Sequence, residues 1–250
     1  MIGREIQVRS LLNKSKIFDY CLNPYRGCQV GCRYCYARLF IPRYSGHKEP
    51  WGTFVDVKAN AVEILKSQIG RAPRGVVWVS SVCDPYQPLE GRYRLTRRLL
   101  EVLLQFKFPI NLQTKNVLVL RDLDLFCRFE EIEVGLTITT DNESIARLFE
   151  PGASPICQRI EALEKLKKAG LKTFAFLGPL LPGNPERLIS QLDGKVNQVF
   201  IDRMNYLPSI IAFYRRHGLE RFAQDDFFLN QKEKLLRALE ATSIEVEVLF

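Results

Sequence analysis

Three cysteines lie within eight residues near the start of the sequence, in the stretch GCQVGCRYC at residues 27–35. Cys28, Cys32 and Cys35 are spaced C-x3-C-x2-C, and Gly27 and Gly31 loosen the chain around them. Thiolates on such a short loop can converge on three corners of a [4Fe–4S] cluster. The spacing therefore indicates a metal-binding loop rather than a segment of the hydrophobic core.

The predicted cluster leaves one of its four irons without a cysteine ligand. An open coordination position separates a catalytic metal site from a closed structural one. With this spacing the usual occupant is S-adenosylmethionine (SAM), bound through its amino and carboxylate groups, and one-electron cleavage of SAM gives an adenosyl radical. Two alternatives stay open on the residues alone: a zinc site completed by Cys21 or His47, and a redox pair formed by Cys32 and Cys35.

The loop resembles the signature of the radical SAM superfamily, in which C-x3-C-x-aromatic-C carries the cluster. On this resemblance Cys28, Cys32 and Cys35 are the cluster ligands, and Tyr34 is the aromatic residue near the adenine of SAM. The resemblance implies a radical SAM enzyme that generates a 5′-deoxyadenosyl radical for hydrogen abstraction. Its expected cofactors are a [4Fe–4S] cluster and SAM, and its expected partner is an external one-electron reductant of the flavodoxin or ferredoxin type.

Several other segments resemble the spore photoproduct lyase-like branch of this superfamily, also described as DNA repair photolyase-like. In that branch the residue before the aspartate of the second strand, the lysine of a Thr-Lys pair and a hydroxyl residue of the fourth strand contact SAM. These positions hold Cys83, Lys115 and Thr137. The resemblance covers most of the first 185 residues, through residues 23–38, 80–90, 114–124, 150–155 and 178–184.

Cys83 departs from the branch pattern, because a small hydroxyl residue is usual there. In the lyase of this branch, a cysteine two residues earlier gives a hydrogen atom to the product radical, and that position here is Ser81. A serine O–H bond is too strong for a ready hydrogen-atom donor. Alternate residues of a strand share a face, so Cys83 is a candidate catalytic donor in its place. The alternative is a small buried cysteine that packs as a hydrophobe.

The remaining sequence alternates between strands and helices. Each expected strand ends in polar residues and is followed by a helical pattern, and the run at residues 76–79 is as apolar as a strand buried on both faces of a parallel sheet. Six such β/α units predict an α/β fold, an open partial (β/α)6 barrel of the TIM type with parallel strands, whose chemistry lies at the carboxyl ends of the strands. The strands are expected at residues 17–22, 76–79, 109–114, 132–138, 173–177 and 198–201.

We expect one domain over residues 1–250, with a core at about 17–203 and C-terminal helices and a strand at 204–250. Several local expectations accompany this division. A helix at Tyr36 is ended by Pro42, Ser154 caps a helix before Pro155, and residues 208–241 are helical. His47 is expected in an exposed turn, Asp84 is expected to orient its neighbours, and residues 150–152 are expected to set the angle of the following helix.

Composition and charge restrict the class of protein. The sequence has no run of about 18 apolar residues, so nothing is expected to span a membrane. The N-terminus lacks a signal-peptide pattern, and the four scattered cysteines do not form a disulfide framework, so we expect a cytoplasmic protein. The net charge of +8 is compatible with nucleic-acid binding, but the basic residues are spread along the chain.

Three functions follow from these observations. The first is a radical SAM enzyme that modifies nucleic acid or reverses a lesion in it. The second is a radical SAM enzyme acting on a protein, a peptide or a small metabolite, with the charge incidental. The third, of a different class, is a non-catalytic zinc-stabilised module that binds nucleic acid. The sequence does not specify an oligomeric state.

Overall fold

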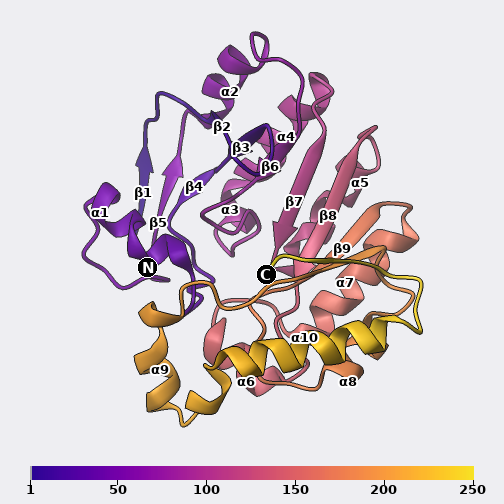
Figure 1. Ribbon diagram of the computed structural model, residues 1–250. Coiled ribbons are helices and arrows are strands. Elements are labelled where there is room, and N and C mark those ends of the chain that lie inside the picture. The colour runs from indigo at the N-terminus through magenta and orange to yellow at the C-terminus, as the bar shows by residue number, and fades with distance from the viewer. Residues whose placement is uncertain (1) are drawn as a thin grey trace.

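The computed structural model describes residues 2–250 and contains an open eight-stranded sheet (Figure 1). Seven of its strands are parallel, and β2 at one edge pairs antiparallel with β3. In spatial order the strands are β2 (Leu12–Lys14), β3 (Tyr20–Leu22), β6 (Val77–Val79), β7 (Ile110–Thr114), β8 (Ile132–Thr137), β9 (Lys172–Leu177), β10 (Gln198–Ile201) and β11 (Glu245–Val248).

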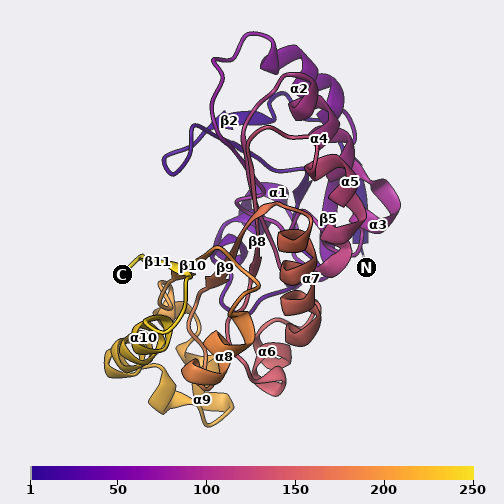
Figure 2. The ribbon, with the colours of Figure 1, turned by 90° about the vertical axis from the view of Figure 1, so that its right-hand side faces the viewer.

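The six strands from β3 to β10 follow one another in chain order, with helices in the connections, so the predicted partial (β/α)6 barrel is confirmed. Helices α4, α5 and α7 lie along one face of the strands (Figure 2). Leu112, Leu136 and Leu177 in the central strands are fully buried. The helices that follow the strands are α2 (Ala61–Ile69), α4 (Leu95–Gln105), α5 (Leu123–Phe126), α7 (Ile156–Lys168) and α8 (Pro185–Leu192).

A second, three-stranded sheet was missed by the sequence analysis. Strand β5 (Phe54–Lys58) pairs parallel with β1 (Ile2–Ile6) and antiparallel with β4 (Tyr25–Arg26), which leads directly into the cysteine loop. Asp56 interrupts the apolar pattern of β5, yet its side chain is only 1% exposed because Arg4 and His47 pair with it. The burial of this strand is thus decided by partners from distant parts of the chain.

Two helix boundaries differ from expectation. The chain forms a 3-10 turn, η1 (Tyr36–Leu39), and then α1 (Ile41–Ser45), so Pro42 begins a helix instead of ending one. Proline is tolerated in the first turn because its missing N–H has no intrahelical partner there. Ser154 does not cap α7, because that helix begins after Pro155, and the Ser154 hydroxyl instead accepts a hydrogen bond from the Val117 backbone N–H at 3.1 Å.

The C-terminal region is helical only in part. Residues 208–241 were expected to be helical, and the structure divides them into several helical segments, two of which are separated at Gly218 with φ of +66°. The region contains η3 (Leu207–Ser209), α9 (Ile211–Arg216), η4 (Glu220–Phe222) and α10 (Asp225–Leu239). The other helical elements of the fold are α3 (Glu90–Tyr93), η2 (Val117–Asp122) and α6 (Glu143–Phe149). Within residues 2–250, no helix has both the length and the apolar content needed to cross a membrane.

Candidate active site at the carboxyl ends of the strands

The cysteine loop, residues 27–35, lies beyond the carboxyl end of β3. Cys28 and Cys32 are buried with Val30 in one cluster, and Cys35 packs against it. Gly27 makes the start of the loop possible, since it has φ of +88° and a Cβ there would come within 2.5 Å of the Phe54 carbonyl oxygen. The fold therefore brings the three cysteines into one packed cluster on a tightly turned loop.

Two neighbouring segments hold this loop in place. The Gln29 backbone N–H donates to the Gln87 side chain at 2.8 Å, in the polar segment after β6. On the other side, the Gly152 N–H donates to the Val30 carbonyl at 2.9 Å. A Cβ at Gly152 would lie 2.2 Å from the Gln29 carbonyl oxygen. Residues 150–152, expected only to set a helix angle, thus press directly on the cysteine loop.

The raised pKa values of the three thiols indicate that they need a cation nearby to exist as thiolates. Burial raises the pKa of Cys28 well above its ordinary value, raises that of Cys32 to about 12, and raises that of Cys35. Thiolates are the form that ligates metal, so three of them are stable in this buried place only with a compensating cation. The Asp84 backbone N–H already donates to the Cys28 sulfur at 3.3 Å, as hydrogen bonds to cluster sulfurs do.

The zinc alternative is weakened at one of its two candidate fourth ligands, His47. Both ring nitrogens of His47 are engaged, Nδ1 with Glu49 and Nε2 with Asp56. A zinc site on this loop would therefore depend on Cys21 for its fourth ligand.

His47 is buried, and the expectation of an exposed loop residue was wrong. Its Nδ1 lies 2.8 Å from a Glu49 carboxylate oxygen and its Nε2 lies 2.9 Å from Asp56. Its ring stacks on Phe54 with centroids 4.0 Å apart. The residue links the end of α1 to β5 through Asp56 and Phe54. Nothing in its local sequence indicated these partners.

Three of the residues expected to contact SAM lie together. The Lys115 ammonium, after β7, donates to the Thr137 hydroxyl at the end of β8 over 3.2 Å and lies 5.8 Å from the Tyr34 ring centroid. Burial alone would lower the pKa of Lys115, but attraction to Cys32 in its thiolate form and to the carboxylates of Glu150 and Asp84 outweighs burial and raises the pKa. The site therefore presents a fixed ammonium and a hydroxyl beside the cysteine loop.

Asp84 positions this lysine, as expected of an orienting residue. One of its carboxylate oxygens accepts from the Thr114 hydroxyl at 2.6 Å and from the Tyr86 N–H at 2.9 Å. The other accepts from the Lys115 N–H at 2.8 Å. Because the same residue donates its own N–H to Cys28, it couples the end of β7 to the cysteine loop.

Cys83 is half-buried and packs against the cluster of cysteines. Its sulfur lies 3.6 Å from the Ser80 hydroxyl and 3.9 Å from the Asn23 side-chain oxygen, and burial raises its pKa to about 11, so the thiol stays protonated. The Ser81 hydroxyl accepts from the Asn23 amide at 3.1 Å. Cys83 and Ser81 thus share a neighbour in Asn23.

The argument that placed Cys83 and Ser81 on one strand face does not hold. Strand β6 ends at Val79, and Ser80 has φ of +75°, which breaks the alternation that a strand would impose. Such a left-handed conformation at a non-glycine residue is uncommon and concentrates at functional sites. The donor role of Cys83 stays a prediction.

A buried ion pair, which the sequence analysis missed, contacts Tyr34. The Glu150 carboxylate pairs with Arg159 at 2.6 Å and accepts hydrogen bonds from the Tyr34 hydroxyl and from Thr139. Burial would raise the pKa of Glu150, but the charges of Arg159 and Lys115 lower it. Glu150 and Tyr34 are 116 residues apart in the sequence, so no local pattern could have joined them.

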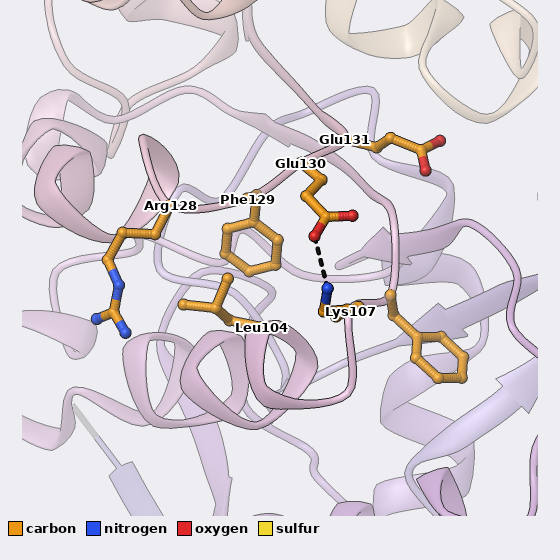
Figure 3. Close-up of a pocket in the computed structure, with 7 residues that line it drawn as sticks. Leu104, Lys107, Arg128, Phe129, Glu130 and Glu131 are labelled. Atoms are coloured by element: carbon orange, nitrogen blue, oxygen red, sulfur yellow. Dashed lines mark hydrogen bonds and ion pairs between the residues drawn. The ribbon is translucent and has the colours of Figure 1, made fainter.

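A small cavity lies at the opposite end of the barrel and is shown in Figure 3. It lies at the amino ends of β7 and β8, measures about 90 Å³, and is lined in part by a Lys107–Glu130 ion pair at 2.8 Å. The cysteine loop, Lys115 and Thr137 lie instead at the carboxyl ends of the strands, which are therefore the candidate active site.

Comparisons with known proteins show the family of the chain. Residues 22–192 match the radical SAM superfamily. The chain is 35% identical over 209 residues to an uncharacterized protein of Methanocaldococcus jannaschii, and the match covers 82% of this chain and 78% of that protein. It is 26% identical over 211 residues to the radical SAM Nα-GlyT isomerase of Pseudomonas phage M6, covering 79% of this chain and 43% of the isomerase.

The fold is similar to that of a spore photoproduct lyase solved in complex with a dinucleoside spore photoproduct. The TM-score is 0.70 with 18% sequence identity, and the match covers 99% of this chain and 82% of the lyase. This likeness in fold agrees with the branch expected from the sequence. The alignment also spans the C-terminal elements, where the sequence resemblance had thinned.

Replacing Glu150 with glutamine tests the buried ion pair. Glu150→Gln leaves Arg159, whose side chain is 1% exposed, as an unpaired buried charge. We expect the free energy of unfolding of the cluster-free protein to fall by about 3–5 kcal/mol, measured by urea denaturation. The control is Glu164→Gln on α7, the helix that carries Arg159. It removes an exposed pair with Lys168 and should change the free energy of unfolding little. Equal losses in the two variants would contradict the assignment.

Proposed function

Because the chain belongs to the radical SAM superfamily, whose members bind a [4Fe–4S] cluster and SAM, we propose that Cys28, Cys32 and Cys35 ligate such a cluster and that the enzyme abstracts hydrogen from a nucleic-acid substrate. The observation that carries the ligand assignment is the burial of these thiols together on one loop, with a backbone N–H already donating to Cys28. When bound and reduced by an external one-electron donor, the cluster supplies the electron that cleaves SAM to the 5′-deoxyadenosyl radical.

The protein's own side chains would bind and orient SAM. The Lys115 ammonium suits the SAM carboxylate, and the Thr137 hydroxyl, 3.2 Å from it, suits the amino group or the ribose. The Gln113 amide donates to the same hydroxyl at 2.9 Å and fixes its orientation. Glu150 holds the Tyr34 ring, which would lie near the adenine. Asp84 fixes the backbone of Lys115.

The proposed substrate class rests on charge and on the comparisons. The net charge of +8 favours a polyanion. The lyase of similar fold was solved with a dinucleoside lesion. A cytoplasmic location and a single domain over residues 1–250 belong to the same proposal, and the free state of all seven cysteines supports a reducing compartment.

Removal of one thiol tests the cluster assignment. We expect the wild-type protein, reconstituted anaerobically with iron and sulfide, to form 5′-deoxyadenosine from SAM and dithionite. Cys35→Ala should reduce that yield to background, because the cluster loses a ligand. The matched control is Cys157→Ala, which removes an exposed thiol on α7 and should leave the yield unchanged. An unchanged yield in Cys35→Ala, or none in the wild type, would overturn the proposal.

Replacement of Lys115 tests the SAM site. Lys115→Met removes the ammonium proposed to bind the SAM carboxylate, so SAM affinity should fall by roughly 10–100-fold, the usual loss for a charged hydrogen bond. Equilibrium dialysis against labelled SAM measures it, while iron and sulfide per chain stay at the wild-type level. The control is Lys167→Met, whose ammonium donates to the Val196 carbonyl at the other end of the barrel. Wild-type SAM affinity in Lys115→Met would place the SAM carboxylate elsewhere.

The salt dependence of binding tests the substrate class. Protein that neutralises phosphates releases counterions, so affinity falls linearly with the logarithm of salt. For four neutralised phosphates of a single strand, we expect a roughly 50-fold loss between about 50 and 200 mM salt. Fluorescence anisotropy with a labelled oligonucleotide measures the slope. A flat salt dependence, or no binding to duplex or single-stranded DNA and RNA, would favour a peptide or small-metabolite substrate.

A further inference from the structure

A row of aromatic side chains leads from the surface toward the candidate active site. Tyr206 stacks on Tyr36 with centroids 5.8 Å apart and an interplanar angle of 20°. Tyr36 is 5.8 Å from Phe40, which is 6.3 Å from Tyr44. The two ends of this aromatic row are open to solvent, since Tyr44 is 80% exposed and Tyr206 is 48% exposed. Tyr36 and Tyr206 are stacked, whereas Phe40 is tilted by 37° to Tyr36 and meets Tyr44 edge-on at 68°. The partly exposed ring of Tyr206 is therefore the member of the row best placed to stack on a further planar group.

The inner member of the aromatic row touches the site itself. Tyr36 follows Cys35 directly, and its hydroxyl donates to the Ser81 carbonyl at 2.6 Å. Ser81 lies in the segment that carries Cys83. A planar group stacked on Tyr206 would therefore lie beside Tyr36, the residue that follows the cysteine loop.

Two distant segments of the chain meet at the aromatic row. Tyr36, Phe40 and Tyr44 lie in η1 and α1, whereas Tyr206 immediately precedes η3, and Figure 1 shows α1 and α9 on the same side of the molecule. Arg38 ties them together by donating to the Ser209 carbonyl at 2.5 Å. Its Nε has no hydrogen-bond partner among the described residues. That Nε is buried, so the contact of the guanidinium with Ser209 is what holds the two segments together.

The positive charge of the protein gathers in the same two segments. Residues 33–48 carry four basic side chains and no acidic one, and residues 203–221 carry four basic side chains and one acidic one. Together they hold seven of the eight net positive charges of the chain. Acidic and basic residues nearly balance elsewhere. Glu49 and Asp202 directly flank the two segments, and Arg203 is paired with Asp225. The rest of this charge lies in two segments that the contacts Arg38–Ser209 and Tyr36–Tyr206 bring together.

We propose that the aromatic row binds unpaired nucleobases of a single strand, with the surrounding arginines and lysines on its phosphates. This inference rests on the proposed function and narrows its substrate to a strand whose bases are unstacked. Every base offers a flat face for stacking on tyrosine, and basic side chains follow the backbone. In a duplex those faces are covered by neighbouring pairs, so a base must leave the stack to reach the row. The row therefore selects single strands over duplexes.

The test compares one oligonucleotide in two forms. Labelled 12-nucleotide single strands of DNA and of RNA, and the same sequences annealed to their complements, are titrated with full-length protein and followed by anisotropy. We expect the single strands to bind about tenfold more tightly than the duplexes, and Tyr206→Ala to remove about tenfold of single-strand affinity. Tyr206→Phe keeps the ring and should restore it. The DNA and RNA arms report which sugar the protein accepts.

The control is Phe106→Ala, which removes a 38%-exposed ring after α4, away from the row, and should leave affinity unchanged. Equal binding of single strand and duplex would overturn the inference, as would unchanged single-strand affinity in Tyr206→Ala with the fold intact by circular dichroism. Formation of 5′-deoxyadenosine by the wild-type protein without oligonucleotide is measured separately. If that reaction occurs and Tyr206→Ala binds normally, only this inference fails; if it does not occur, the proposed enzyme fails whatever the binding result.

Discussion

The buried pair of Glu150 and Arg159 is the interaction on which the arrangement of the site depends. Arg159 donates to the carbonyl oxygens of Ser154 and Thr137, at 2.6 and 3.0 Å, in addition to its ion pair. The Glu150 carboxylate accepts a hydrogen bond from the Tyr34 hydroxyl. One pair of charges thus fixes the end of β8, the start of α7 and the cysteine loop. Removing either partner would leave a buried charge without compensation, which is why such pairs are costly to break.

Electrostatic balance explains why so many charged groups lie beneath a loop of thiols. Lys115 and Arg159 are cations placed near Cys32 and Glu150, and each moves the pKa of its neighbours toward the charged form. Without a metal, burial dominates at the thiols and keeps them protonated. The site is therefore arranged for a net cationic occupant at the cysteines and for an anionic group at Lys115, and SAM has such a group in its carboxylate.

The outer surface differs from the interior in how its charges are compensated. Buried charges at the site are paired, whereas segments 33–48 and 203–221 together hold eight basic side chains and one acidic one. The aromatic rings between them are partly exposed, an arrangement that gives stacking and attraction to phosphate without a large cost of burial. The candidate active site thus lies at the carboxyl ends of the strands, and the proposed substrate-binding surface is the aromatic row next to it.

The sequence by itself determined the cofactor class and the barrel. The C-x3-C-x2-C spacing is local, and apolar strands that alternate with amphipathic helices carry their own periodicity, so both can be read without knowing the fold. Residues at strand ends, such as Lys115 and Thr137, could be placed near the loop because parallel strands bring their carboxyl ends together. Local rules failed where burial depends on distant partners, as for His47 and Ser154.

Only the tertiary structure decided the support and the surroundings of the site. Glu150 reaches Tyr34 across 116 residues, Asp56 is buried by partners from outside its strand, and Tyr206 reaches Tyr36 from the far end of the chain. Such contacts follow from how the connections fold back over the sheet, which no short stretch of sequence encodes. The approach of the two basic segments has the same origin, because Arg38 and Ser209 are 171 residues apart in the sequence and meet only in the fold.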